Sequence, residues 1–427
     1  MSHSSLLSMD RLRFLANRLK ERLWVKPLAL CLLSIGGAFI AKLADDSGLG
    51  EVLPQVSLDS VESLLSIMAA SMLMIATFAV GSMVAAYASA SAAATPRSIP
   101  LVIADDVTQN ALSVFIGAFI FSLVSLIAVK NGFFGSAGLF AIFALTVFVF
   151  ATVVITLMRW VDRIARLGRV VNTIERVEEA TADALKRRRR APTMSALAVS
   201  PSESTERGVE LFSASVGYVQ HIDMEKLQDC AEESGCHVTV LALPGTFVSA
   251  GRALFAIDGG HPLPVAALLS TVTIGRSRTF EDDPRFGLLA LSEIADKALS
   301  TGVNDPGTAI DVIGAMVRLF TLWQVPLEEN QKRDIVYDRI SVPHLSVEDM
   351  FDDAFTAIAR DGAGFVEVSV RLQRALFALS RSDDEGVSDA ARKCSRMALG
   401  RSERVMEHEE DIDAVRQAAT FSSAAIT

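Results

Sequence analysis

Four long apolar stretches within the first 158 residues are the feature that most limits how this chain can fold. A helix needs ~20 apolar residues to cross the hydrocarbon core of a membrane, and each stretch is near or above that length. The chain is therefore expected to be an α-helical integral membrane protein with four transmembrane helices in residues 27–158, behind a basic cytoplasmic N-terminus, 1–26. The stretches cover residues 27–44, 63–96, 111–129 and about 138–158.

The composition agrees with a chain that is partly embedded in a membrane. Hydrophobic residues make up 51% of it, which excludes disorder as its dominant state. Four cysteines in 427 residues are too few for a disulfide scaffold. Residues 1–190 carry 19 Lys and Arg against 14 Asp and Glu, whereas residues 191–427 carry 21 against 36. A basic, apolar first half is therefore followed by an acidic second half.

Basic residues at the ends of the apolar stretches predict their orientation. Lys and Arg are enriched on the cytoplasmic side of membrane helices, and the loop at 45–62 has acidic residues but no basic one. Both termini are therefore expected in the cytoplasm, with Trp24 and Trp160 at the inner membrane edge. Lys42 argues against interpreting the first stretch as a cleaved signal peptide. The basic residues are Arg11, Arg13, Arg18, Lys20, Arg22 and Lys26 before the first stretch, and Arg159, Arg163, Arg166 and Arg169 after the fourth.

The second apolar stretch is too long for a single upright crossing. Its uncharged residues would form a helix of ~50 Å, which must tilt, break or project from the membrane, and which should end near Pro96. Small residues recur on one face of this helix, and such a face either packs closely against another helix, the favoured interpretation, or lines a polar pore. We call this set the small-residue stripe: Ser63, Ser66, Ala70, Thr77 and Gly81.

The third and fourth stretches contain no ionisable residue within 111–129 or 139–158. Transporters that are coupled to protons or ions normally place charged groups inside the membrane, so a coupled transporter is disfavoured. A channel remains compatible with the sequence, because hydroxyl groups and backbone carbonyls can line one.

Residues 159–190 have the pattern of an amphipathic connector helix. Its apolar face would pair with a second copy or pack on the chain's own soluble domain, and the sequence leaves both open. We interpret the basic run 186–190 as a solvated hinge rather than a lipid-binding patch, and residues 191–206 as a flexible linker. The recurring residues of the face are Ile164, Leu167, Val171, Ile174, Val177, Thr181 and Leu185.

The rest of the chain predicts a cytoplasmic α+β domain at 207–380 and a charged helical segment at 381–427. A short helix is expected at 223–234, with Asp223 as its N-cap. Strands are expected at 209–219, 237–243, 252–257 and 272–278, and helices at 288–299, 306–323, 347–360, 365–380 and 388–418.

Several short motifs together resemble those of the bacterial predicted membrane proteins classed as domain-of-unknown-function family 2254. The resemblance runs from the first apolar stretch to about residue 380, and one departure is Thr301, where the family usually has proline. It implies an integral protein of the bacterial inner membrane with a cytoplasmic domain, and no established activity. The motifs are Ser91 with Thr95–Arg97, Gly217–Asp223, Pro244–Val248 with Gly251, Gly275–Phe280, Asp283–Leu288 and Ala298–Ala309.

Arginines in two of these motifs form one candidate ligand or interface site. Arg276, Arg278 and Arg285 surround the acidic run 281–283. Mutual pairing within a loop is the favoured interpretation, and the alternative is an electropositive pocket shared with the turn at 304–308.

That turn is the second candidate. Asn304, Asp305 and Thr308 are expected to start a helix, with Asp305 as N-cap and Pro306 in the first position. The alternative is an anion site on the exposed N–H groups of the helix.

The sequence contains no nucleotide-binding loop, metalloprotease motif or serine-hydrolase motif, so we expect neither an enzyme nor a bound cofactor. Cys230, Cys236 and His237 lie close together, with His221 and His261 as further candidates, but they lack the paired spacing of a metal site. The acidity of the second half disfavours nucleic-acid binding.

The leading hypothesis is a channel- or transport-like homo-oligomer in the lipid bilayer, regulated by its cytoplasmic domain. The alternative is a membrane-tethered scaffold or sensor without transport activity. The sequence does not identify a small-molecule or ion ligand for either.

Overall fold

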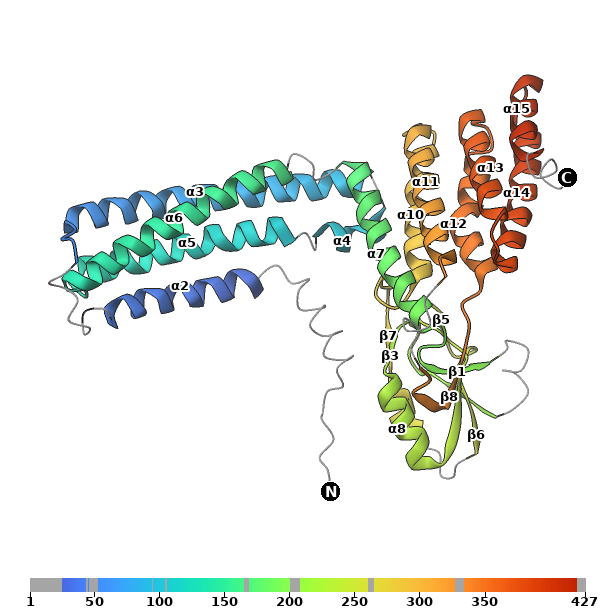
Figure 1. Ribbon diagram of the computed structural model, residues 1–427, viewed down its shortest axis with the longest axis horizontal. Coiled ribbons are helices and arrows are strands. Elements are labelled where there is room, and N and C mark those ends of the chain that lie inside the picture. Colours follow the sequence, from blue (N-terminus) through green and yellow to red (C-terminus); the bar gives the residue numbers. More distant parts are fainter. Residues whose placement is uncertain are drawn as a thin grey trace. The chain divides into compact units, whose positions relative to one another are not determined.

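The chain folds into two compact units, with a boundary between Asn172 and Thr173. We call them the helical unit and the α+β unit; Figure 1 shows their elements. Residues 1–24 of the expected N-terminal segment, which include Trp24, lie outside the described residues. The computed structural model describes residues 25–43, 45, 53–93, 95–103, 106–164, 169–199, 208–259, 265–326 and 334–420.

Three helices of the helical unit are long and apolar enough to cross a membrane. They are α3 (Leu58–Ala93), α5 (Asp106–Lys130) and α6 (Ser136–Ile164). The first expected span forms helix α2 (Val25–Leu43), whose apolar part, Pro27–Lys42, is shorter than the other three. Length and composition thus support three of the four expected spans. The first expected span, helix α2, stays a prediction.

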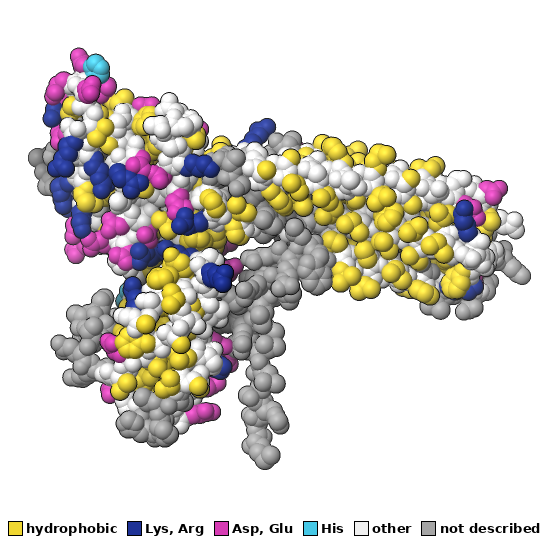
Figure 2. Space-filling model, turned by 180° about the vertical axis from the view of Figure 1, so that it is seen from behind, with side chains coloured by type: hydrophobic (Ala, Val, Ile, Leu, Met, Phe, Trp, Pro, Cys, Tyr) yellow, Lys and Arg dark blue, Asp and Glu magenta, His cyan; other side chains and the backbone are white. Residues whose placement is uncertain are grey.

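Helix α5 packs against α2, α3 and α6. The outward side chains of these helices are mostly hydrophobic, and in Figure 2 they form a broad apolar surface with charged side chains towards its ends. Among the most exposed are Leu33, Met74, Phe148 and Met158. An apolar surface of this extent suits contact with lipid rather than water.

Helix α3 continues without a break to Ala93, so the overlong apolar stretch forms one helix. Thr95 then caps the 3₁₀ turn Pro96–Ser98, because its hydroxyl accepts a hydrogen bond from the N–H of Arg97 at 3.3 Å. The expected end of the helix near Pro96 is confirmed. A short helix, α4 (Ile99–Ile103), follows.

Trp160 does not lie at the surface of the helical unit. Its side chain is 2% exposed, and the rings of Phe78 and Phe115 meet it edge-on, with centroids 6.1 and 6.2 Å away. It is a packing residue between α3, α5 and α6, and its expected position at the inner membrane edge stays a prediction. Burial of a large aromatic side chain explains its packing between these helices.

Asp45 joins the end of α2 to the start of α6. Its carboxylate accepts hydrogen bonds from the N–H groups of Gly135 at 2.8 Å and Gly138 at 2.6 Å, and Lys42 donates to it at 3.2 Å. A Cβ atom at either glycine would overlap the carboxylate. Asp45 therefore acts as the cap of α6, and the two helix ends lie together as in neighbouring antiparallel helices.

The α+β unit contains a five-stranded and a three-stranded sheet. The first has the order β1-β8-β4-β6-β2, parallel from β1 to β4 and antiparallel from β4 to β2; the second is antiparallel, in the order β5-β3-β7. The strands are β1 (Ala196–Val199), β2 (Val209–Phe212), β3 (Gly217–Ile222), β4 (Cys236–Val240), β5 (Phe247–Val248), β6 (Ala253–Gly259), β7 (Val272–Gly275) and β8 (Tyr337–Pro343).

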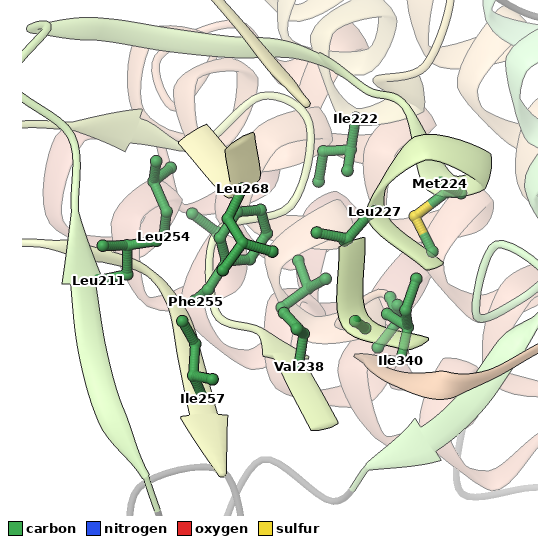
Figure 3. Close-up of a cluster of buried hydrophobic side chains, with 14 of the residues drawn as sticks. Leu211, Ile222, Met224, Leu227, Val238, Leu254, Phe255, Ile257, Leu268 and Ile340 are labelled. Carbon is green, nitrogen blue, oxygen red and sulfur yellow. The ribbon is translucent and has the colours of Figure 1, made fainter. Parts of the chain in front are cut away.

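One hydrophobic core lies between the two sheets and two short helices, α8 (Met224–Ser234) and α9 (Val265–Leu269). Figure 3 shows side chains from both sheets and from α8 and α9 meeting in it, among them Ile222, Phe255 and Leu268. The strand expected at 209–219 is two strands, β2 and β3, which belong to different sheets. Asp223 caps α8 as predicted, because its carboxylate accepts from the N–H of Lys226.

Six further helices, α10 to α15, belong to the described α+β unit. The segment expected at 381–427 is not separate from the other helices, since α14 packs on α12 and α13, and α15 packs on α13 and α14. The helix expected at 388–418 is interrupted at residues 406–408. The helices are α10 (Pro284–Leu299), α11 (Pro306–Gln324), α12 (Val347–Asp361), α13 (Val366–Ser380), α14 (Glu385–Val405) and α15 (Glu409–Thr420).

The connector forms helix α7 (Val170–Arg190), which packs on α10 and α11 of its own chain. Thr181 lies so close to Gly287 that a Cβ atom there would overlap its hydroxyl. Glu178 makes a bidentate ion pair with Arg318, with both N–O distances at 2.7 Å. The buried residues of α7 include Ile174, Val177, Thr181, Leu185 and Arg188.

The basic run 186–190 is the last turn of α7 rather than a hinge. Lys and Arg are good helix formers, and their charges are favourable at a helix C-terminus. Strand β1 lies within the expected linker 191–206, because Ala196–Val199 pairs with β8. Residues 200–206 of that linker, and residues 165–168 before α7, lie outside the described residues.

Replacing Asp45 by alanine is expected to lower the free energy of unfolding by about 1–2 kcal/mol, the usual cost of a lost helix cap. Burial acts to raise the pKa of Asp45, but hydrogen bonds from Gly135, Gly138 and Lys42 lower it overall. The stabilisation is therefore present above the ordinary pKa of 3.8 and is lost as the pH falls through the folded pKa. Thermal unfolding in detergent at pH 7 and pH 3 tests both statements. Asp59→Asn is the exposed control, and a wild-type melting temperature for Asp45→Ala at pH 7 would contradict the prediction.

Replacing Gly287 by alanine is expected to weaken the packing of α7 on α10, because the new methyl group would overlap Thr181. The matched control is Gly400→Ala in α14, where a Cβ atom meets nothing within 4 Å and alanine should stabilise the helix by up to about 1 kcal/mol. Melting temperatures should fall for Gly287→Ala and hold or rise for Gly400→Ala. The double variant Thr181→Gly with Gly287→Ala should recover part of the loss, and equal effects of the two alanines would be incompatible with a tight contact.

Candidate functional site

Four of the motifs that carry the family resemblance meet at one place in the α+β unit. Strand β3 lies between β5 and β7, and Gly217 approaches Gly275 so closely that a Cβ atom would lie 2.4 Å from the Gly275 carbonyl oxygen. The turn at Pro244–Gly245 is tied to β3, because Gly245 donates to the carbonyl of Val219 at 2.8 Å. We call residues 276–283, between β7 and α10, the acidic loop, and it is the centre of the candidate site.

Asp283 ends the acidic loop and starts α10. Its carboxylate accepts from Nε and Nη2 of Arg278 at 2.6 and 2.9 Å, and from the N–H of Phe286 at 3.2 Å. Gly245 has a φ of 93°, and a Cβ atom there would overlap the carboxylate. Asp283 is 3% exposed; burial raises its pKa, which the Arg278 guanidinium opposes. Arg278 is therefore paired within the acidic loop, as the pairing interpretation predicts.

Strand β3 holds the middle of the acidic loop. Nδ1 of His221 and Oδ2 of Asp282 are 2.6 Å apart, and Gln220 donates from Nε2 to the carbonyl oxygen of Ser277 at 2.8 Å. The side chain of Gln220 also fills the space beside Gly275. The polar residues of β3 thus position the loop rather than point to open solvent.

The last turn of α7 contacts the same loop. Arg187 donates to the carbonyl oxygen of Glu281, and Arg188 donates from Nη2 to that of Asp282 at 3.4 Å. Arg188 is 6% exposed. Burial lowers its pKa, and the carboxylates of Asp282 and Asp283 oppose this effect. Arg187 and Arg188 were not among the predicted site residues, and the signal for them was the helical pattern that continues through the basic run.

The other two arginines of the candidate site differ from Arg278. Arg276 is exposed. Arg285 pairs with Asp353 at 2.7 Å and Asp349 at 2.5 Å, both on α12. Burial acts to lower the pKa of Arg285, but these two carboxylates raise it overall.

The second candidate motif forms the start of α11. Asp305 accepts from the N–H of Thr308 at 3.1 Å and from its hydroxyl at 2.7 Å, and both interactions lower the pKa of Asp305. Asn304 adopts a positive φ of 52°, and its N–H donates to the carbonyl of Ser300. This is the geometry of a capped helix start, which is what the favoured interpretation predicts.

The two candidate motifs lie at opposite ends of α10. Asp283 precedes the first residue of α10, whereas Asp305 follows its last turn, and the 16 residues of α10 place its ends ~24 Å apart. A pocket that joins Arg276 to Asp305 would have to extend along the whole helix.

The small-residue stripe lies on the outer side of α3. Its five residues are all exposed, whereas the buried residues of α3 lie on the opposite side of the helix. Apolar side chains flank the stripe, among them Leu73 and Met74. The Thr77 hydroxyl donates to the carbonyl of Leu73 at 2.9 Å, within the same helix. The stripe is therefore not used for packing among the described helices of its own chain.

The cysteines and histidines offer no metal site among the described residues. Cys230 and Cys236 are buried free thiols whose pKa values burial raises. His237 is hydrogen-bonded through Nε2 to the hydroxyl of Ser341 at 2.7 Å, and His261 lies outside the described part of the chain.

Comparison with known proteins identifies the family. The family model described as "Predicted membrane protein (DUF2254)" matches residues 20–378. The chain belongs to this family. Two uncharacterised proteins, from Mycobacterium bovis and Mycobacterium tuberculosis, are each 32% identical to it over 121 residues, which cover 26% of this chain and 23% of theirs. The DUF2254 chain thus matches about a quarter of the length of these curated relatives. No solved structure matches it.

Replacing Asp283 by asparagine is expected to destabilise the α+β unit by about 3–5 kcal/mol, because it leaves the largely buried Arg278 guanidinium, which is 13% exposed, without its counter-charge. Asp349→Asn is the matched control. It removes one of two carboxylates from Arg285 at a half-exposed position, so its cost should be below about 1 kcal/mol. Urea unfolding of the full chain in detergent, followed by circular dichroism, measures both variants; similar costs would show that the Asp283 pair is not the stronger constraint.

Proposed function

We propose that this DUF2254 protein is a non-enzymatic, channel-like homo-oligomer of the bacterial inner membrane, regulated by a cytoplasmic α+β unit. In this proposal α2, α3, α5 and α6 all span the membrane and both termini lie in the cytoplasm. The Asp45 contact supports α2 as a span, because it places the end of α2 beside the start of α6. The basic residues Arg159 and Arg163 at the end of α6 support the orientation.

The observation that carries the proposal is the outward small-residue stripe of α3. Within lipid, helices associate through close backbone packing and hydrogen bonds rather than the hydrophobic effect, and small residues favour such contacts. Since no described helix of the same chain covers the stripe, a second copy is the partner we propose. Hydroxyl groups at Ser63, Ser66 and Thr77 give this face the polar character that a pore lining needs.

A membrane-tethered scaffold or sensor without transport is the second candidate. The hydrogen bond that the Thr77 hydroxyl donates within its own helix favours this second candidate, because a hydroxyl satisfied in this way can lie at a dry helix–helix contact. Both candidates predict an oligomer through α3, and they differ in whether a solute passes.

Cross-linking tests the α3 interface that both candidates share, and flux separates the two candidates. In a background with Cys31, Cys230, Cys236 and Cys394 replaced by serine, Ala70→Cys should form oxidant-dependent dimers in membranes. Met158→Cys, on the exposed side of α6, is the control and should form few. In liposomes, the wild-type chain should conduct ions or small solutes, and Ala70→Trp should abolish the flux.

Each result decides one part of the proposal. Cross-linking at both positions, or at neither, would overturn the α3 interface. Cross-linking at Ala70 without any flux over a panel of ions and small solutes would overturn the channel and favour the scaffold.

A further inference from the structure

Arg188 is the most deeply buried basic side chain at the acidic loop, and it is poorly hydrogen-bonded. It is 6% exposed; Nη2 makes one long hydrogen bond, 3.4 Å, to the carbonyl oxygen of Asp282, and Nη1 has no partner among the described residues. The buried hydroxyl of Thr279, on the same loop, also has no partner there. Two buried polar groups at the acidic loop thus lack a protein partner among the described residues.

The surrounding charges do not compensate Arg188 fully. Asp283 is already bonded to Arg278, and Asp282 to His221. The pKa of Arg188 is lowered by burial in spite of both carboxylates. Burying a charged group with incomplete hydrogen bonding costs free energy, and an apolar side chain in its place is often neutral or stabilising.

The rest of α7 is held independently of this turn. Thr181 interlocks with Gly287, and Glu178 pairs with Arg318, respectively about two and three turns before Arg188. Among the described residues, side-chain contacts from Arg187 and Arg188 to loop carbonyls attach the last turn to the acidic loop. The contacts at Thr181 and Glu178 therefore do not depend on the two arginine contacts of the last turn.

We propose that the last turn of α7, residues 186–190, is a releasable latch on the acidic loop, docked when Arg188 is buried and released when its guanidinium turns out into water. In the docked state, α7 is attached to the loop that starts α10. In the released state, α7 and α10 remain in contact at Thr181 and Gly287, but the loop is free of α7. The latch is a conformational device of the α+β unit; its use in gating rests on the proposed function.

Hydrogen–deuterium exchange of the full-length protein in detergent tests the latch. Arg188→Met keeps a side chain of similar length but removes the charge, so it should lock the docked state. Exchange in peptides covering residues 276–286 and the end of α7 should slow by about tenfold, with a higher melting temperature. Arg190→Met, at the exposed end of the same turn, is the matched control and should change neither. Faster exchange in Arg188→Met would show that Arg188 is a fixed anchor and would overturn the latch.

A measurement on the wild-type chain covers the case in which Arg188→Met does not fold. Phenylglyoxal modifies exposed guanidinium groups, and mass spectrometry locates the modified residues. A latch predicts that Arg188 reacts under native conditions, more slowly than Arg190 but well before global unfolding. Reaction of Arg188 only on global unfolding would overturn the proposal.

Liposome flux separates the latch from the channel. If the wild-type chain conducts, Arg188→Met should change the flux while leaving Ala70→Cys cross-linking intact. Unchanged flux would overturn the gating role. Absence of any flux in the wild-type chain would overturn the channel, and the exchange experiment would still decide the latch.

Discussion

One buried carboxylate, Asp283, holds together the part of the α+β unit where the family motifs meet. The same two oxygens bond Arg278 and cap α10, and the bare backbone of Gly245 gives them room. A buried carboxylate that lost its partner would be left as an uncompensated charge. One structural requirement therefore explains residues of three motifs, namely the turn at 244–245 and the two neighbouring motifs that carry Arg278 and Asp283.

Local chemistry explains which parts of the fold the sequence could predict. Asp223 and Asp305 were assignable as N-caps because the bonds that they make reach only three residues ahead. The long helices were assignable because their periodicity is strong. Strands β1 and β8 were missed, because β1 has four residues and its parallel partner lies about 140 positions further along the chain.

In the candidate site, too, contacts between neighbouring residues could be predicted from the sequence, whereas contacts between distant residues could not. The sequence indicated the pairing of Arg278 with the acidic run, since the partners lie five residues apart. It could not indicate that Arg188 approaches that run from α7, 94 residues away, nor that Asp45 reaches Gly135 and Gly138. In each case one partner is a backbone group, which carries no sequence signal of its own.

Along the chain, helix α7 links α6 to the α+β unit. It follows α6, the last apolar helix, and enters the α+β unit with its apolar face buried. The Thr181–Gly287 contact leaves no space for the helices to slide past one another, so an axial displacement of α7 must carry the start of α10 with it or break the contact. Because packed interfaces shift between discrete arrangements rather than deform continuously, the weakly bonded last turn is where such a displacement costs least. A tight contact followed by a weakly bonded turn therefore allows α7 to change its attachment to the acidic loop without unfolding the core.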